Sequence, residues 1–264
     1  IVFLYCLFCI ECLWIILIKE CLRGKIGRHK GLKILMVYFN KEIVQTKKKP
    51  IFIFKIDNFF DYDFYLDIKK LFLKVNHNEL SLTKNFGKIS FFPEELNYDN
   101  ENQKKIFAKL NEIIFSKEFF YFFIKKVFFT NVMNQNNILR KIRYLRYPVC
   151  DNNKKSFFNF LYSKLSVSYE FSYIKNNGGI VPHVDAQRKY LSLLLYFPDD
   201  QQKEIEYGTT FWSSKSPNYS NTHIQNSTQI NEFKSKSKVL YKSPFVSNCL
   251  YGFLRNDFSW HTVE

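Results

Sequence analysis

The pattern of apolar and polar positions divides the chain into a helix-rich first half and a strand-rich second half. A short apolar run of β-forming residues at 50–60 predicts a buried strand that ends in a turn. Apolar side chains then recur every three or four residues at 61–75 and again at 102–129, which predicts one helix and then one or two more. The helix-rich region therefore covers residues 50–140.

Beyond residue 140 the apolar positions recur with a period of two, which is typical of strands. The sequence Asn-Asn-Gly-Gly at 176–179 predicts a turn between two of them. The predicted strands are 168–174, 190–197, 248–254 and 260–263. Helices followed by many short strands favour an α+β fold in which residues 141–264 form a β-sandwich or jelly roll.

One stretch of the second half departs from the strand pattern. Residues 213–238 are dominated by Ser, Asn, Thr, Lys and Gln. We interpret this stretch as a long surface loop inserted between two strands of a single domain that covers residues 36–264.

Residues 1–18 are almost wholly apolar, and a basic stretch follows them. This arrangement is typical of a membrane anchor with a cytoplasmic basic flank. The alternative is translated upstream sequence, with the native protein starting at Met36. We favour the alternative, in which residues 1–35 are a leader outside the domain and the protein is cytoplasmic. A genuine anchor at residues 1–18 would make it membrane-bound.

The net charge of +15 comes from 39 Lys and Arg residues against 24 Asp and Glu residues. The basic residues are spread through sequence rich in Asn, Phe and Ile, whereas a nucleic-acid-binding surface concentrates them in a stripe. A genome rich in A and T explains this composition, so we expect no nucleic-acid partner. The sequence does not indicate an oligomeric state.

Cysteine usage argues against a disulfide-stabilised fold. Four of the six cysteines lie in the first 21 residues, in an apolar run that has no matching second half. This spacing predicts neither a disulfide framework nor a zinc site.

Three residues near the carboxyl end have the chemistry of a metal site: His183, Asp185 and His261. Side chains two apart on a strand point to the same face, so His183 and Asp185 can reach one ion. His261 can join them if the sheet curls. Two imidazoles and one carboxylate occupy one face of an iron(II) ion and leave the opposite positions open.

The residues around this triad form an ordered series of motifs. The series contains the Tyr173 strand, the Gly178-Gly179 turn, Pro182-His183-Val184-Asp185, the strand 191–197 with Ser192 and Tyr196, the turn Gly208-Thr209, and Ser259-Trp260-His261. In this order the motifs resemble the iron(II)- and 2-oxoglutarate-dependent dioxygenases, in particular the prolyl-4-hydroxylase-like branch. The resemblance covers residues 140–264 best and extends more loosely back to Pro50.

The resemblance implies a double-stranded β-helix (jelly-roll) core with the helix-rich half packed against it. It also implies that His183, Asp185 and His261 bind Fe(II), and that Tyr173, Ser192 and Tyr196 contact 2-oxoglutarate. Dioxygen is the second cosubstrate, and a C–H bond of an unidentified protein side chain or small molecule is hydroxylated. Related halogenases lack the carboxylate, so Asp185 favours hydroxylation.

One part of the family pattern has no match. The family places an Arg or Lys several residues after the distal histidine to bind the far carboxylate of 2-oxoglutarate, whereas this sequence stops at Glu264. We therefore expect a chain that is cut short at both ends and is poorly active in this form. Two alternatives stay open: a non-catalytic jelly-roll or cupin-like metal-binding module, and a cupin-like metal hydrolase or isomerase.

Overall fold

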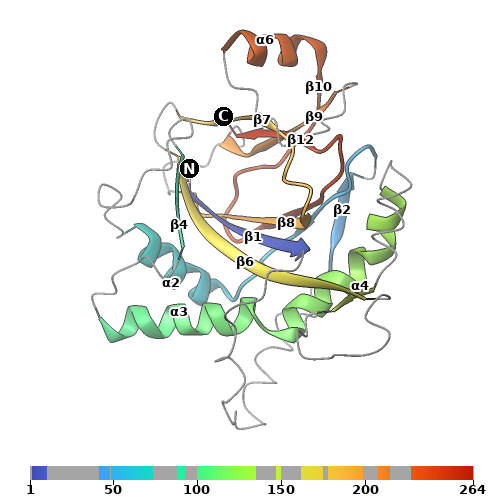
Figure 1. Cartoon of the computed structure of the whole chain (residues 1–264). Helices are drawn as coiled ribbons and strands as arrows, with labels where there is room; N and C mark the ends of the chain where they lie inside the picture. Colours follow the sequence, from blue (N-terminus) through green and yellow to red (C-terminus); the bar gives the residue numbers. More distant parts are fainter. Residues whose placement is uncertain are drawn as a thin grey trace.

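Two β-sheets and four helices form the part of the chain that the structure describes (Figure 1). The structure is a computed structural model. It describes residues 2–10, 42–47, 49–73, 88–92, 100–134, 147–149, 162–174, 178–198, 207–214 and 227–263.

The helices are α2 (Tyr62–Leu73), α3 (Glu101–Ile114), α4 (Lys117–Asn134) and α6 (Ser227–Lys236). The strands are β1 (Val2–Ile10), β2 (Val44–Lys47), β3 (Ile53–Ile56), β4 (Lys88–Phe91), β5 (Tyr147–Val149), β6 (Tyr162–Ile174), β7 (Ile180–His183), β8 (Lys189–Tyr196), β9 (Thr209–Ser213), β10 (Lys238–Lys242), β11 (Leu250–Leu254) and β12 (Trp260–Val263). The α+β class predicted from the sequence is confirmed.

The large sheet has the strand order β2-β3-β11-β8-β1-β6-β4, and β5 pairs with β6 outside this order. The small sheet has the order β10-β9-β12-β7. All described pairings are antiparallel except that of β5 with β6. From β6 onward the chain passes back and forth between the sheets, because β6, β8 and β11 belong to the large sheet and β7, β9, β10 and β12 to the small one.

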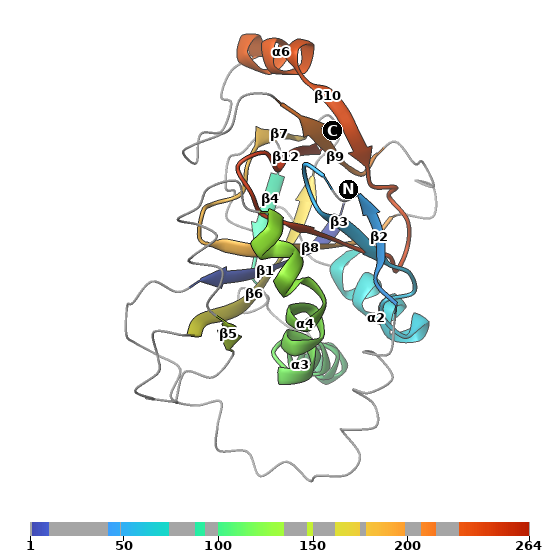
Figure 2. The same ribbon diagram turned by 90° about the vertical axis from the view of Figure 1, so that its right-hand side faces the viewer.

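The helices predicted at 61–75 and 102–129 are confirmed, and the second is divided in two. Ser116 separates α3 from α4 and begins the second helix, since its hydroxyl accepts a hydrogen bond from the backbone N–H of Phe119 at 3.0 Å. Asn100 begins α3 in the same way, through the backbone N–H of Gln103. Helices α2, α3 and α4 lie on the opposite side of the molecule from α6 (Figures 1 and 2).

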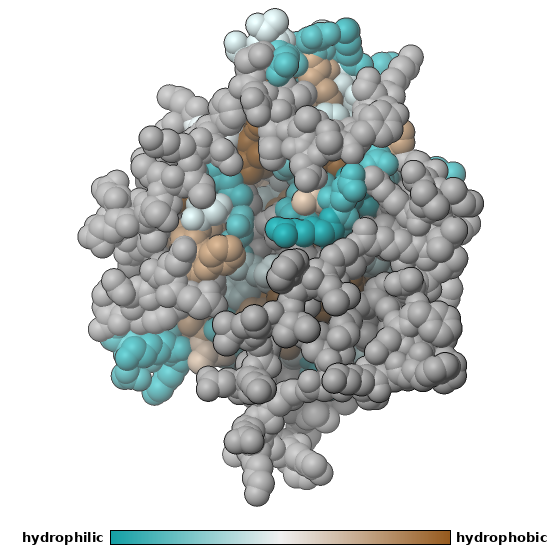
Figure 3. Space-filling view, in the orientation of Figure 1, coloured by the Kyte–Doolittle hydropathy of each residue, from teal (hydrophilic) through white to brown (hydrophobic). Residues whose placement is uncertain are grey.

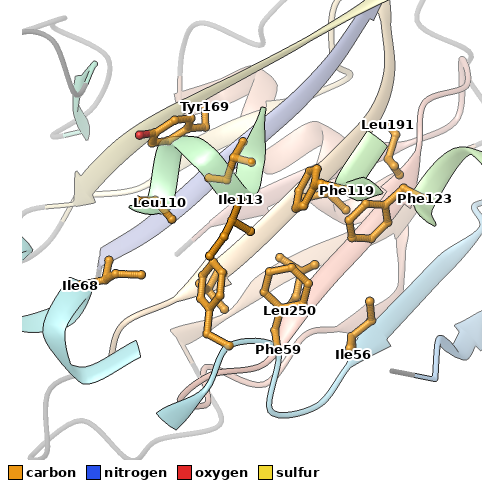
Figure 4. Close-up of a cluster of buried hydrophobic side chains, with 14 of the residues drawn as sticks. Ile56, Phe59, Ile68, Leu110, Ile113, Phe119, Phe123, Tyr169, Leu191 and Leu250 are labelled. Carbon is orange, nitrogen blue, oxygen red and sulfur yellow. The ribbon is translucent and has the colours of Figure 1, made fainter. Parts of the chain in front are cut away.

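A core rich in phenylalanine joins α2, α3 and α4 to one face of the large sheet. Figure 4 shows Ile68, Ile113 and Phe123 from the three helices in one cluster with Leu191 of β8 and Leu250 of β11. These side chains are almost fully buried. Burial of aromatic and aliphatic surface on this scale is the main force that holds the helices on the sheet.

A second core fills the space between the two sheets, with Leu194 and Tyr196 of β8 and Phe211 of β9 among its members. Alternate residues of β8 therefore serve different cores, because Leu193 and Leu195 face the helices. A Cβ atom at Gly252 of β11 would lie 2.1 Å from the Phe54 ring, so only glycine fits at this close approach.

Asn248 connects the turn after β3 to the start of β11. Its amide oxygen accepts from the backbone N–H of Phe60 and its amide nitrogen donates to the Phe60 carbonyl, both at 2.8 Å. Asn248 adopts φ 52°, a left-handed conformation that asparagine tolerates better than most residues. These bonds hold the turn beside the β3–β11 ladder, and that ladder joins the first half of the chain to the same sheet as the second.

The amino-terminal segment differs from the expected leader. Residues 2–10 form β1, which pairs with β6 on one side and β8 on the other. Residues 11–35 lie outside the described residues. No helix in the described part of the chain is long and apolar enough to cross a membrane.

The stretch 213–238 also differs from the expected loop. Residues 227–236 form α6, while Ser213 ends β9 and Lys238 begins β10. A surface helix of this kind has the same polar composition as a loop, because α6 has no fully buried residue and most of its side chains are exposed. Figure 3 shows hydrophilic side chains at the end of the molecule where α6 lies. Residues 215–226 lie outside the described residues.

Candidate metal centre

The structure brings His183, Asp185 and His261 together, as the sequence predicted. His183 ends β7, Asp185 follows two residues later, and His261 lies on the neighbouring strand β12. His183 and His261 are paired directly in the ladder, and their ring centroids are 4.1 Å apart. One ligand atom from each of the three residues lies within 4.8 Å of the others.

Backbone carbonyls orient both imidazoles. The Nδ1 atom of His183 lies 2.9 Å from the carbonyl oxygen of Val181, and that of His261 lies 2.9 Å from the carbonyl oxygen of Ser259. A carbonyl only accepts hydrogen bonds, so each Nδ1 carries the proton in the neutral ring. Each Nε2 then keeps the lone pair that a metal ion requires, and the bond at Nδ1 fixes the ring orientation.

The Asp185 carboxylate is buried and has a partner on each oxygen. Ser192 on β8 donates to Oδ2 at 2.6 Å, and the Lys189 ammonium donates to Oδ1 at 2.6 Å. Arg255 donates through Nε to the backbone carbonyl of Asp185 and pairs with Asp257. The Asp185 side chain is 2% exposed, so these groups rather than water surround it.

Burial alone would raise the pKa of Asp185, but nearby positive charge as a whole has the larger effect and lowers this pKa. The positive charge of Lys189, joined by His261 and His183 whenever those rings are protonated, holds the pKa of the carboxyl well below its usual range. Asp185 is therefore a carboxylate at neutral pH, which is the form that binds a metal ion.

Aromatic side chains border the centre on the side of the inner core. The rings of Phe253 and Phe211 lie 4.8 Å and 6.1 Å from the His261 ring, measured between centroids. Both phenylalanines are fully buried. They provide an apolar wall, which strengthens electrostatic interactions inside the site.

A separate cluster supports the ligand strands from the other face of the small sheet. Val184, Trp212 and Trp260 pack together there, and Phe233 of α6 packs against them. The centroid of the Phe233 ring is 4.9 Å from that of Trp260. Trp212 also donates through its indole nitrogen to the Thr262 hydroxyl at 2.9 Å, which links β9 to β12.

The structure separates the three residues predicted to contact 2-oxoglutarate. Ser192 lies at the triad through its bond to Asp185. Tyr173 packs against the core under the helices, whereas its neighbour Ile174 belongs to the core between the sheets. Tyr173 is therefore on the opposite face of the large sheet from Ser192, and the structure does not bring it to the triad.

Tyr196 shares the inner face of β8 with Ser192, but its hydroxyl has protein partners. It donates to the Thr209 hydroxyl at 2.8 Å, lies 2.6 Å from the Ser243 hydroxyl, and accepts from the backbone N–H of Thr209. Burial raises the pKa of Tyr196, while the hydrogen bonds from Ser243 and Thr209 act in the opposite direction. These bonds give Tyr196 a structural role in joining β8, β9 and the segment after β10.

Sequence reasoning missed two cationic residues beside Asp185. Lys189 lies four residues after it, and Arg255 directly follows β11. The spacing of Lys189 was a usable signal, because it follows the His-x-Asp pair at the start of the next predicted strand. Arg255 gave no such signal, since only the fold shows that it is 3% exposed and bonded to the ligand segment.

Comparison with protein-family models, with curated proteins and with solved structures finds no match to this chain.

Proposed function

We propose that this chain is an iron(II)- and 2-oxoglutarate-dependent dioxygenase that hydroxylates a C–H bond of an unidentified substrate. The proposal rests on one observation: two imidazoles and a carboxylate converge to within 4.8 Å of one another. This donor set is the facial triad of non-haem iron(II) oxygenases.

The donor chemistry fits iron(II). His183 and His261 each offer an Nε2 atom because their Nδ1 atoms are bonded to carbonyls, and Asp185 offers an anionic oxygen. Three ligands on one face leave positions for two more molecules on the other. When bound, the iron with 2-oxoglutarate and dioxygen would supply the oxidising chemistry, in which one oxygen atom enters the substrate and succinate and carbon dioxide are released.

The order of the strands supports a double-stranded β-helix core. From β6 to β12 the chain crosses repeatedly between the two sheets, with β9 and β10 as consecutive strands of the smaller one, and the two histidines come from adjacent strands of that smaller sheet. A jelly-roll arrangement of this kind places residues from distant parts of the sequence around a common interior. Fold alone does not determine function, so the triad carries the proposal.

The surrounding residues assist in defined ways. Ser192 holds one oxygen of Asp185 and thereby fixes how the carboxylate faces the two imidazoles. Phe211 and Phe253 limit the access of water next to His261. Tyr196 joins strands through its hydrogen bonds and Tyr173 contributes through packing, so only Ser192 of the three predicted contacts lies next to a proposed ligand.

The experiment is a turnover assay in which the protein is loaded with iron(II) and 2-oxoglutarate without oxygen and is then exposed to air. Succinate should form in an amount that exceeds the enzyme, and a variant with Asp185→Ala should form none. Absence of succinate from a wild-type sample that contains bound iron would overturn the proposal.

A non-catalytic metal-binding module is the second candidate. The observation that favours it is the pairing of both Asp185 oxygens with Lys189 and Ser192, because these partners keep the triad assembled without any requirement for turnover. Under this alternative the chain binds metal but releases no succinate, so the same assay separates the two candidates.

A further inference from the structure

The ion pair between Lys189 and Asp185 occupies the carboxylate that the proposed metal ion needs. The distance from the lysine Nζ to Asp185 Oδ1 is 2.6 Å, and the two side chains are 16% and 2% exposed. A buried carboxylate requires a positive or hydrogen-bonding partner, and here the ammonium is that partner.

A metal ion at the triad would compete with this ammonium. Both are cations, both bind the same carboxylate, and the low polarity around His261 increases the repulsion between them. One partner of Asp185 must therefore move or lose part of its interaction when a metal ion binds.

Lys189 is the partner of Asp185 that can move away. Its long side chain is partly exposed and lies at the beginning of β8, so its ammonium can turn toward solvent. Ser192 is fully buried in the middle of the same strand and cannot follow. Its bond to Oδ2 also leaves Oδ1 for the metal ion.

We propose that Lys189 is an internal counter-cation that holds Asp185 in the metal-free protein and couples metal binding to the binding of an anion. The proposal rests on the metal site in the proposed function. It adds that the bare ion binds weakly and that a dicarboxylate bound beside it strengthens its binding.

The balance of charge gives the reason for the coupling. The dication and Lys189 together bring three positive charges to the site, Asp185 brings one negative charge, and Arg255 is already paired with Asp257. If Lys189 stayed beside Asp185, two positive charges would remain uncompensated in a buried place, which is unfavourable without an anionic ligand. A dicarboxylate supplies two negative charges and gives Lys189 a new partner.

The first experiment measures Co(II) binding by visible absorption, without any added carboxylate, in the full chain. Lys189→Met should bind Co(II) about tenfold more tightly than wild type, because the competing cation is gone. Lys189→Gln, which keeps a hydrogen-bond donor, tests the same charge effect if the methionine variant does not fold. Equal or weaker Co(II) binding in the folded variant would overturn the proposal, since loss of a merely structural residue does not strengthen binding.

The second experiment repeats the titration with 2-oxoglutarate present. Wild type should gain about tenfold in Co(II) affinity, whereas Lys189→Met should gain much less. The same gain in both proteins would contradict the coupling. By linkage, Co(II) must strengthen 2-oxoglutarate binding by the same factor, which provides an internal check.

Lys88→Met is the matched control. Lys88 forms an ion pair with Glu170 in the same sheet at similar exposure, 20% and 19%, but at a pair of strands that carries no triad residue. This control should leave both Co(II) titrations unchanged. These measurements are independent of turnover. The Lys189 proposal can therefore fail while succinate still forms, and it can also hold in a protein that forms no succinate.

Discussion

His183 and His261 face each other across directly paired positions of β7 and β12, with 4.1 Å between their ring centroids. Side chains alternate along a strand, so a shift of one residue in this pairing would turn one imidazole to the other face of the small sheet. The register of two short strands therefore determines whether the two imidazoles of the candidate metal centre meet. The pairing of Trp212 with Trp260 on the adjacent ladder supports that register from the opposite face.

Removal of the Ser192 hydroxyl should weaken metal binding. Ser192→Ala leaves Asp185 Oδ2 without its donor, and loss of a group that orients a metal ligand typically lowers affinity about 10- to 100-fold. The unpaired buried oxygen also costs roughly 1–3 kcal/mol of the free energy of unfolding. Co(II) titration and urea unfolding measure the two effects.

Ser172→Ala is the matched control for this prediction. Ser172 is equally buried and hydrogen-bonded, but to Ser90 and Glu170 rather than to a ligand. It should lose stability without losing Co(II) affinity. If both variants bind Co(II) as wild type does, Ser192 has no role in positioning Asp185.

Tyr196→Phe should reduce stability more than it changes the metal centre. The substitution removes a buried hydroxyl that bonds to Thr209 and Ser243, which costs about 1–3 kcal/mol in unfolding free energy. Urea denaturation measures the loss. Co(II) binding should stay within about twofold of wild type, since the hydroxyl contacts no triad residue. An unchanged denaturation midpoint would show that the network does not contribute to stability.

The strands that carry the centre were only partly predictable from sequence. The alternation from Ser168 to Ile174 and the apolar run from Tyr190 to Phe197 predicted β6 and β8, because burial of one or both faces leaves a clear pattern. The strand β4 at Lys88–Phe91 alternates polar and apolar residues, but with only four residues the run is too short to predict a strand. Its place in the sheet comes from pairing with β6, which is a tertiary effect.

Phe233→Ala should loosen the packing of α6 on the small sheet. Phe233 contacts the rings of Trp212 and Trp260 and is the α6 residue that packs into their cluster. Loss of a partly buried ring of this kind costs about 1–3 kcal/mol. Tryptophan emission should move to longer wavelength as the two indoles become more exposed to water.

Thr228→Ala, an exposed change on the same helix, serves as the control and should leave the emission unchanged. An equal spectrum for Phe233→Ala and wild type would contradict the assigned packing of α6.

The Cys249 thiol should resist alkylation in the folded protein. Burial raises the pKa of Cys249 from 9.0 to about 12, and the bond to Tyr251 only partly opposes this. The thiolate is the reactive form, so iodoacetamide at pH 8 should modify Cys249 slowly until urea unfolds the chain. Peptide mass mapping after timed exposure measures the rate at this residue.

The same shift predicts a loss of stability at alkaline pH. The folded state disfavours the thiolate, so stability is complete below the ordinary thiol pKa of 9.0 and decreases as pH rises toward about 12. Cys249→Ala should show a smaller decrease across this range. Rapid alkylation of folded protein at pH 8 would contradict the assigned environment.

The triad was predictable from sequence because His183 and Asp185 are two residues apart at the end of a strand and His261 lies in a recognisable final motif. The partners of Asp185 were not, because Lys189 and Arg255 reach it only through the folding of β8 and β11 around the site. Tyr173 shows the opposite error, since an aromatic residue near a motif was assigned to the site although it faces the other core. Residue type and order were enough to identify the three candidate ligands, whereas the direction of each neighbouring side chain depends on the folded sheet.

The central claim is that His183, Asp185 and His261 form one metal site, and equilibrium dialysis against Co(II) tests it most directly. Metal content per chain should approach one equivalent in wild type, and the three alanine variants His183→Ala, Asp185→Ala and His261→Ala should each lose affinity by about 100-fold or more while keeping their secondary structure by circular dichroism. Equal metal content in wild type and in all three folded variants would contradict the claim.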